Sequence, residues 1–123
     1  MNNIQVNAWV ENLCNFNFSN NYDVITSHGT LHFVTRKCWR DFIYNAKLST
    51  NKNGFHIIQI FTDKIPASED IAPFVKGLAK EGELKELYKD WKIIEFLQYE
   101  FEDDHPGVGL HYHSSNKIIA QRQ

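Results

Sequence analysis

The sequence contains little glycine, proline or cysteine, with six, three and two of these residues among 123. No glycines cluster between an extended run and a helix, so a phosphate-binding turn is not predicted. The two cysteines, Cys14 and Cys38, are too few for the disulfide framework of a small secreted domain. We therefore interpret both as free, half-buried thiols.

Long apolar runs and a strong net charge are also missing. No apolar stretch approaches the roughly 18 residues of a membrane-spanning helix, and the start, Met1–Ile4, lacks the basic region of a secretory signal. A net charge of −2, with both signs interleaved, argues against a nucleic-acid partner. These absences predict a cytoplasmic protein without a membrane partner, and the length fits a single domain over residues 1–123.

The first half of the sequence alternates between extended and helical patterns. Gln5–Val10 is a short extended run, and Asp23–Ser27 has the continuous apolar character of a strand covered on both faces. Thr35 is a suitable N-cap for a helix, and Phe55–Phe61 is the clearest buried strand. The helix has one apolar stripe, made of Trp39, Phe42, Ile43 and Ala46. Together these elements predict a right-handed parallel βαβ unit.

The second half of the sequence ends in two long extended runs. Glu83–Lys89 is predicted to form a helix before them. Trp91–Glu102 and Leu110–Gln121 are the extended runs, and the turn-like Asp103–Gly107 connects them. We expect an antiparallel hairpin at one edge of the sheet. The whole order of elements predicts an α/β fold of parallel strands with a C-terminal antiparallel hairpin.

Several segments, in their order and spacing, carry a family resemblance. Tyr22–Ser27, followed by Leu31–Phe33, resembles the fourth strand of class I S-adenosylmethionine-dependent methyltransferases. Lys47–Gly54 is similar to the turn before the fifth strand of that family, and Lys117–Arg122 is similar to its final strand. Glu81–Trp91, which reads EGELKELYKDW, is the most specific segment, because it resembles the EGEL, Y and W block of the tellurite-resistance type.

The resemblance implies a truncated Rossmann-like methyltransferase sheet. The family orders its strands 3-2-1-4-5-7-6, and a glycine-rich turn after the first strand holds the cofactor. Neither that turn nor the acidic residue after the second strand has a counterpart in this sequence, which begins near the third strand at Gln5–Val10. Asp23–Ser27 is then expected to have an uncovered edge. An uncovered apolar edge predicts a homodimer, or a partner chain that covers it.

Three functional hypotheses follow. The resemblance implies S-adenosylmethionine as cofactor, and methyl transfer to a small molecule or a metalloid oxyanion by a fragment or subunit that needs a partner chain. The alternative is a non-catalytic, degenerate methyltransferase domain that acts in self-association or partner regulation. The third hypothesis is an unrelated module that binds a small ligand through its histidine-rich hairpin.

The resemblance also implies cofactor contacts. Asn12 stands where the family usually has an aspartate near the adenine amino group, and an asparagine oxygen can accept from the same amine. Four residues after the fourth strand would line the methionine end of the cofactor: Thr26, Ser27, His28 and Gly29. This position agrees with the rule that open α/β sheets bind ligands beyond the carboxyl ends of their strands. Ordinary turn residues are the competing interpretation.

Three histidines belong to the predicted hairpin. His111 and His113 are two residues apart on a strand and point to one face, and His105 lies across the turn. With the carboxylates of Asp103 and Asp104 they could bind zinc or another transition metal. No fourth ligand is obvious from the sequence, so we predict no metal site. Histidines that line the substrate side of the cleft, and solvated hairpin residues, are the alternatives.

The other histidines and two arginines are also candidates. His32 is predicted on the substrate side, near the same rim as His28, where either ring could act as a general base. His56, inside an apolar strand, is predicted to be a core histidine with satisfied hydrogen bonds. Arg36 and Arg40 are four residues apart and are predicted to form a solvated helix face, with anion binding as the alternative.

Overall fold

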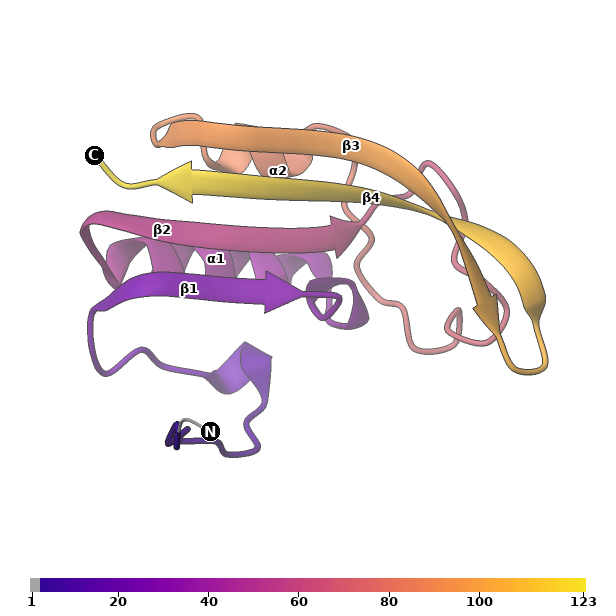
Figure 1. Cartoon of the computed structure of the whole chain (residues 1–123), viewed down its shortest axis with the longest axis horizontal. Helices are drawn as coiled ribbons and strands as arrows, with labels where there is room; N and C mark the ends of the chain where they lie inside the picture. Colours follow the sequence, from indigo (N-terminus) through magenta and orange to yellow (C-terminus); the bar gives the residue numbers. More distant parts are fainter. Residues whose placement is uncertain (1–2) are drawn as a thin grey trace.

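The computed structural model describes residues 3–123 and contains one four-stranded sheet with helices on one face (Figure 1). The strands are β1 Tyr22–His28, β2 Thr50–Phe61, β3 Lys92–His105 and β4 Gly109–Gln121. The helices are α1 Arg36–Leu48 and α2 Glu83–Leu87, and two short 3-10 helices are η1 Leu13–Asn15 and η2 Leu31–Phe33. The strand order is β1-β2-β4-β3. This order matches 4-5-7-6, the later strands of the expected sheet.

The parallel βαβ pairing predicted from the first half is confirmed. β1 and β2 run parallel, with Thr26 opposite Ile57. α1 begins after Thr35, whose hydroxyl accepts a hydrogen bond from the amide of Cys38 at 3.2 Å. Trp39, the first residue of the predicted apolar stripe, is fully buried. The local signals for this helix therefore agree with its packing.

The C-terminal hairpin is also confirmed. β3 and β4 pair antiparallel from Lys92 opposite Gln121 to His105 opposite Gly109. The turn is shorter than predicted, because residues 103–105 belong to β3 and the chain reverses at 106–108. As a result, the hairpin extends beyond the ends of β1 and β2 and curves away from the rest of the sheet (Figure 1).

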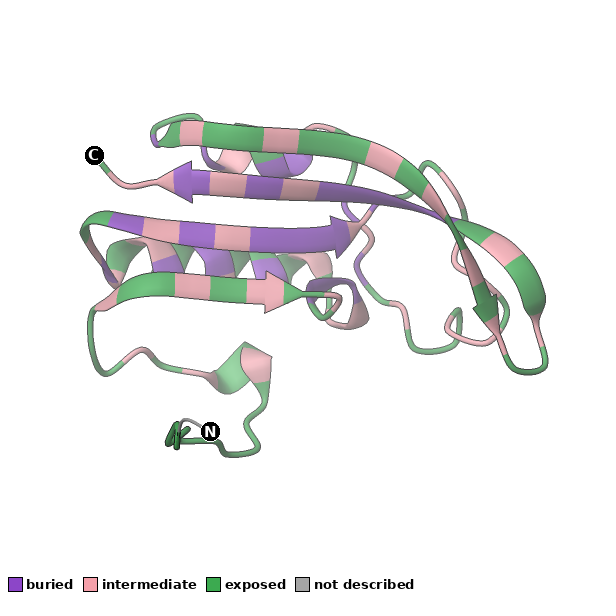
Figure 2. Ribbon diagram, in the orientation of Figure 1, coloured by how far each residue is buried: buried purple, intermediate pink, exposed green. Residues whose placement is uncertain are grey.

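The core lies between the sheet and its two helices. Alternate side chains of β2, among them Ile58 and Ile60, are buried toward α1 and α2, as is Ile118 of β4. Figure 2 shows the buried residues concentrated on the two central strands. Among the described residues no helix covers the opposite side of the sheet, which we call the open face. Val24 and Leu97, on this face, are 52% and 43% exposed.

β1 occupies one edge of the sheet. The prediction that Asp23–Ser27 is covered on both faces is wrong, because Val24, Thr26 and His28 are exposed on the open face. Within residues 3–123, β1 pairs with β2 alone, so its expected uncovered edge is present. The predicted extended run Gln5–Val10 forms no strand and is exposed. A short extended run becomes a strand only beside a neighbour that accepts its backbone hydrogen bonds.

A disulfide connects the N-terminal segment to α1. Cys14 of η1 and Cys38 of α1 are bonded, with their Cα atoms 5.2 Å apart, so the prediction of free thiols is wrong. The ring of Phe18 also packs on Phe42 of α1, with centroids 5.5 Å apart. The number of cysteines could not indicate this bond, because it depends on how closely the folded chain brings the two residues together.

Arg36 and Arg40 do not form a solvated face, contrary to the prediction. Both pair with Glu83 of α2, and Arg36 makes two hydrogen bonds of 2.7 Å to its carboxylate. Burial alone would raise the pKa of Glu83, but the hydrogen bonds from Arg36 and from the Lys80 amide hold the pKa below its usual value. The ionised carboxylate of Glu83 therefore fastens α2 to α1.

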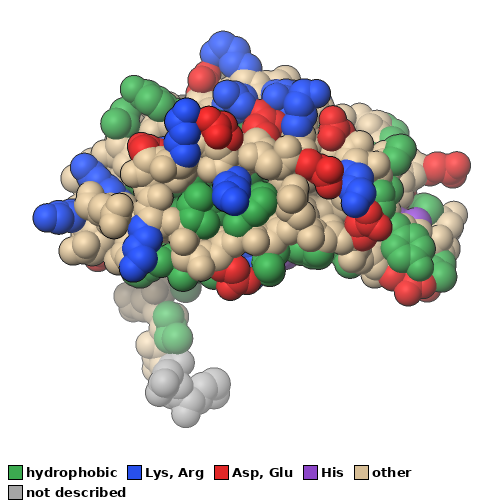
Figure 3. Space-filling model, turned by 90° about the horizontal axis from the view of Figure 1, so that it is seen from above, with side chains coloured by type: hydrophobic (Ala, Val, Ile, Leu, Met, Phe, Trp, Pro, Cys, Tyr) green, Lys and Arg blue, Asp and Glu red, His purple; other side chains and the backbone are tan. Residues whose placement is uncertain are grey.

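The remaining charged side chains are interleaved on the surface. Figure 3 looks onto the β3 side of the molecule and shows Lys and Arg next to Asp and Glu. Lys64 pairs with Glu100 at 2.7 Å, and Lys89 pairs with Glu86 at 2.8 Å.

Of the helices within residues 3–123, none combines the length and the hydropathy needed to cross a membrane.

Candidate functional site

The predicted cofactor contacts lie where β1 ends, next to the end of β2. Side chains alternate along β1, so Thr26 and His28 point to the open face and Ser27 to the helix face. The chain leaves β1 through Gly29, whose φ of 68° is readily adopted only by glycine. The amide of Gly29 donates to Oε1 of Gln59 at 2.8 Å. Gln59 therefore holds the end of β1, residues 26–29, which we call the rim, against β2.

A cavity of about 250 Å³ opens beside the rim. Residues of β1, β2 and β3 line it, together with the turn after β1: His28, Gly29, Gln59, Phe61, Tyr99 and Phe101. The cavity is near the carboxyl ends of the two parallel strands, where open α/β sheets bind ligands. Complete small-molecule sites measure about 300 to 1,000 Å³. The cavity formed by the described residues is smaller than this range.

His32 was predicted to lie at the rim next to His28, but in the structure it is buried. Only 1% of its surface is exposed, and its ring stacks on Phe61 with centroids 4.1 Å apart. Its Nδ1 atom accepts a hydrogen bond from the amide of Phe61 at 3.2 Å. Burial, and then the nearby ring of His113, lower the pKa of His32 to about 4. The ring of His32 is therefore neutral at pH 7 and packs against Phe61.

Phe61 contacts both His32 and the hairpin. The ring of His113 also stacks on Phe61, with centroids 4.5 Å apart and an angle of 19° between the rings. Two rings cannot share one face of a phenyl group, so Phe61 lies between His32 and His113. His113 is 2% exposed. The rim and the hairpin histidines therefore share one aromatic stack.

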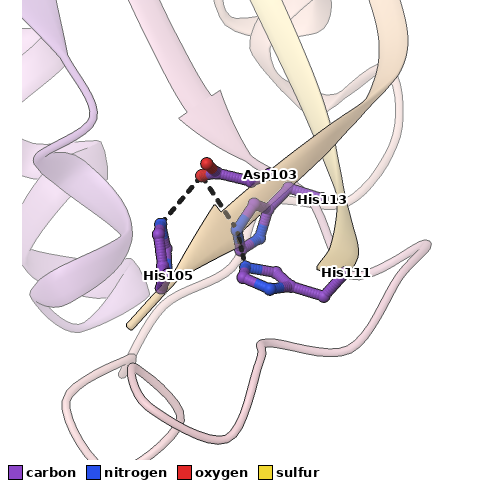
Figure 4. Close-up of side chains that lie close together, drawn as sticks. All are labelled: Asp103, His105, His111 and His113. Carbon is purple, nitrogen blue, oxygen red and sulfur yellow. Dashed lines mark hydrogen bonds and ion pairs between the residues drawn. The ribbon is translucent and has the colours of Figure 1, made fainter. Parts of the chain in front are cut away.

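The hairpin brings four polar side chains together (Figure 4). Asp103 and His105 come from β3, and His111 and His113 come from β4. Oδ2 of Asp103 is 2.9 Å from Nε2 of His105 and 3.7 Å from Nε2 of His113. The Nε2 atoms of His111 and His113 are 3.0 Å apart. This confirms that His111 and His113 share a face, and it identifies Asp103 as the fourth group that the sequence did not make obvious.

Two of these histidines have their other ring nitrogen engaged. Nδ1 of His105 is 2.6 Å from Oδ2 of Asp70, and Nδ1 of His111 is 2.8 Å from the carbonyl oxygen of Gly109. The carbonyl oxygen of Gly109 is an acceptor, so a neutral His111 ring carries its hydrogen on Nδ1 and directs its Nε2 lone pair into the cluster. His105 lies between the carboxylates of Asp70 and Asp103, so both of its ring nitrogens donate when the ring is protonated. Asp70 also accepts from the hydroxyl of Ser68 at 2.5 Å.

The charges differ within the cluster. The hydrogen bond to Asp70 raises the pKa of His105, and Asp103 raises it further. Burial lowers the pKa of His113. Burial would raise the pKa of Asp103, but the amide of Asp104 and the ring of His105 hold the pKa below its usual value. At neutral pH the cluster therefore presents an ionised carboxylate next to a neutral, buried imidazole.

Two other candidates lie apart from these groups. The side-chain oxygen of Asn12 accepts from the amide of Cys14 at 3.0 Å and caps η1. This is the geometry of a turn residue. Asp104 is exposed, and its side chain points to the face of β3 opposite Asp103.

Five contributors to the site were not identified from the sequence: Gln59, Phe61, Asp70, Tyr99 and Phe101. Gln59 interrupts an apolar strand with a polar side chain, and that interruption was a usable signal. Phe61 was identified only as the end of a buried strand. Asp70 lies in the irregular connection between β2 and α2, 35 residues before His105, and no local pattern links the two.

The strand order, the helices on one face and the ligand edge define the later half of a Rossmann-like S-adenosylmethionine-dependent methyltransferase fold. The crystal structure of TehB from Haemophilus influenzae matches 86% of this chain and 37% of its own, with a TM-score of 0.72 and 27% identity. The N-methyltransferase NodS from Bradyrhizobium japonicum WM9, solved with S-adenosyl-L-homocysteine, matches 91% of this chain and 52% of its own, with a TM-score of 0.62. At 12% identity, NodS shows the fold alone.

The chain belongs to the family described as tellurite resistance protein TehB, which matches residues 1–106. The probable S-adenosyl-L-methionine-dependent methyltransferase TehB of Haemophilus influenzae is 38% identical over 82 residues. That match covers 65% of this chain and 27% of the relative, so the chain spans about a quarter of the relative's length. The family resemblance seen in the sequence is confirmed.

The fold family implies S-adenosylmethionine, and the described residues fit part of it. The rim of β1 and the cavity of about 250 Å³ suit the methionine and methyl end of the molecule. The ribose hydroxyls are normally held by an acidic side chain, and the glycine-rich turn allows close approach of the backbone. Neither group is found among residues 3–123. The fit is therefore partial.

Proposed function

We propose that this chain forms the acceptor-side half of an S-adenosylmethionine-dependent methyltransferase, which a segment with the glycine-rich turn completes. The strand order β1-β2-β4-β3 carries the proposal, because the free edge of β1 is where the first strand of the family sheet pairs. The cavity at the ends of β1 and β2 supports it further, since it lies at the ligand edge of such a sheet.

The chain's own residues would position the acceptor. When bound, S-adenosylmethionine would supply an electrophilic methyl group for transfer to an acceptor lone pair, with the sulfur keeping the electrons of the broken S–C bond. Phe61, Tyr99 and Phe101 provide an apolar wall, and His28 provides an imidazole that can take up an acceptor proton. The small cavity suits a small molecule or a metalloid oxyanion, in agreement with relatives described as tellurite resistance proteins.

A chimera tests this function. The part of Haemophilus influenzae TehB that precedes the matched 82 residues is fused to the start of this chain. We expect the chimera to transfer a labelled methyl group from S-adenosylmethionine to tellurite. His28→Ala should slow the transfer at least about tenfold, because it removes the imidazole at the rim. Tyr44→Ala, an exposed change on α1, is the control and should leave the rate unchanged.

Two results would contradict this proposed function. A chimera that unfolds cooperatively, and so has a folded structure, but transfers no methyl group would overturn the proposed activity. Equal rates for the His28 and Tyr44 variants would remove the rim of β1 from the site.

The uncovered edge favours a second candidate function, in which this chain associates with a second copy of itself. The backbone edge of β1 has no partner within residues 3–123, and Val24 on the adjoining open face is exposed. Pairing along β1 would satisfy the free backbone groups and cover that apolar side chain. The same edge would receive a partner chain that supplies the first half of the sheet.

Light scattering on the purified chain measures this association. We expect the mass of a dimer for the wild type and of a monomer for Val24→Lys, because a charged side chain next to the edge opposes strand pairing. Tyr44→Lys adds the same charge at an exposed residue of α1, away from the edge of β1, and should stay dimeric. A wild-type chain that remains monomeric at high concentration would exclude self-association.

A further inference from the structure

We propose that the tip of the hairpin is a binding site for a divalent transition-metal ion, with zinc as the expected occupant. The ligands are Nε2 of His105, His111 and His113 and a carboxylate oxygen of Asp103. This site is independent of methyl transfer, because it uses residues at the far end of β3 and β4 and none that line the rim cavity.

The donor set and its spacing suit zinc. Imidazole nitrogens and a carboxylate oxygen are common zinc ligands, and four of them make a tetrahedral site. Two nitrogens at about 2.0–2.1 Å from a tetrahedral zinc lie about 3.3 Å from each other. Three separations within the cluster, 2.9, 3.0 and 3.7 Å, lie close to that value. All the ligand atoms are within 4.8 Å of one another, so a small closure of the hairpin would complete the shell.

The facing imidazoles of β4 support a cation between them. His111 holds its hydrogen at Nδ1, near the carbonyl of Gly109, so its Nε2 lone pair points at Nε2 of His113. In the absence of metal, Nε2 of His113 can donate its hydrogen to that lone pair across the 3.0 Å contact. A metal ion would take the place of this hydrogen and would also engage His105 and Asp103.

The surroundings orient these ligands as they do in metal sites. The carboxylate of Asp70 accepts from Nδ1 of His105, which directs Nε2 of that ring toward the cluster. Phe61 stacks on His113 and fixes the plane of its ring. The side chains of His105 and Asp103 are 32% and 36% exposed, which leaves an entry path from solvent. A bound ion would therefore connect the hairpin to Asp70 and to the stacked wall of the rim.

Calorimetric titration of the chain with zinc, after a chelator has removed bound metal, tests the site. We expect saturation at one equivalent. Asp103→Asn and His111→Ala should each weaken binding at least about tenfold, because each removes a ligand, and Asp70→Asn should weaken it about tenfold through His105. Asp104→Asn is the matched control: it makes the same change at the next residue, on the opposite face of β3, and should bind like the wild type.

A second measurement separates the site from loose surface binding. Cobalt, used in place of zinc, should give the strong visible absorption of a four-coordinate ion in the wild type and in Asp104→Asn, and lose it in His111→Ala. Zinc should also raise the midpoint of thermal unfolding of the wild type. The proposal fails if the wild type binds no stoichiometric zinc, or if the Asp103 and Asp104 variants bind equally well. Neither result bears on the methyltransferase proposal.

Discussion

His56 illustrates how one polar side chain is accommodated in the core. Its surface is fully buried; Nε2 lies 2.7 Å from the hydroxyl of Thr50, and Nδ1 lies 2.6 Å from the hydroxyl of Tyr88. The prediction of a core histidine with satisfied hydrogen bonds is confirmed. Burial lowers the pKa of His56 to about 4, which gives the ring a measurable effect on stability.

We expect acid to destabilise the fold through this ring. Between pH 6.5 and about 4, the unfolded chain binds a proton at His56 that the folded chain does not. The free energy of unfolding therefore falls as the pH falls through this range, and the loss approaches roughly 3 kcal/mol. His56→Gln cannot titrate, so its unfolding free energy, measured with denaturant across this pH range, should fall less steeply. His32 contributes to both proteins alike, and parallel curves would contradict the expectation.

Among the candidate site residues, those that depend on local spacing could be predicted. The two-residue spacing of His111 and His113 on a strand was sufficient to place both rings on one face. Asp70 was not predictable, because its contact with His105 depends on the path of an irregular connection. His32 was misplaced for a similar reason: its burial under Phe61 follows from the packing of η2 against β2.

The same distinction holds for whole elements. α1 and the β3–β4 hairpin were predictable because a cap, an apolar stripe and long extended runs are encoded within each segment. The predicted strand Gln5–Val10 failed because strand formation needs a neighbouring strand, and none is beside it in the described residues. The pairing of Arg36 and Arg40 with Glu83 links two helices and was likewise invisible in either helix alone.

α2 provides a test at the level of elements. It has five residues, too few for a helix that is stable by itself, and Glu83 connects it to α1 with its side chain 7% exposed. Glu83→Gln should lower the free energy of unfolding by about 2 kcal/mol, because the partly exposed Arg36 and Arg40 lose the charged acceptor of their hydrogen bonds. Denaturant unfolding measures this loss.

Glu86→Gln is the matched control on the same helix. Glu86 is exposed and, among residues 3–123, pairs with Lys89 only, so its loss should cost about 0.5 kcal/mol or less. Equal losses for the two variants would show that the Glu83 contacts do not hold α2 in place.

At the scale of the whole molecule, the four described strands correspond to the later strands of a Rossmann-like methyltransferase sheet. The open face and the free edge of β1 lie together, and the rim cavity opens at the end of the same strand. In the proposed enzyme one added segment would cover the apolar face, pair with β1 and complete the ligand site. In that proposal, the same added segment would serve both stability and function.

The most direct test is a calorimetric titration of S-adenosyl-L-homocysteine into the chimera and, in parallel, into the chain alone. We predict saturable binding by the chimera, because the segment beside β1 provides the other half of the site. We predict no saturable binding by the chain alone at the same concentrations. Equal affinity in both proteins, or a folded chimera that binds nothing, would contradict the claim that one ligand site is divided at the edge of β1.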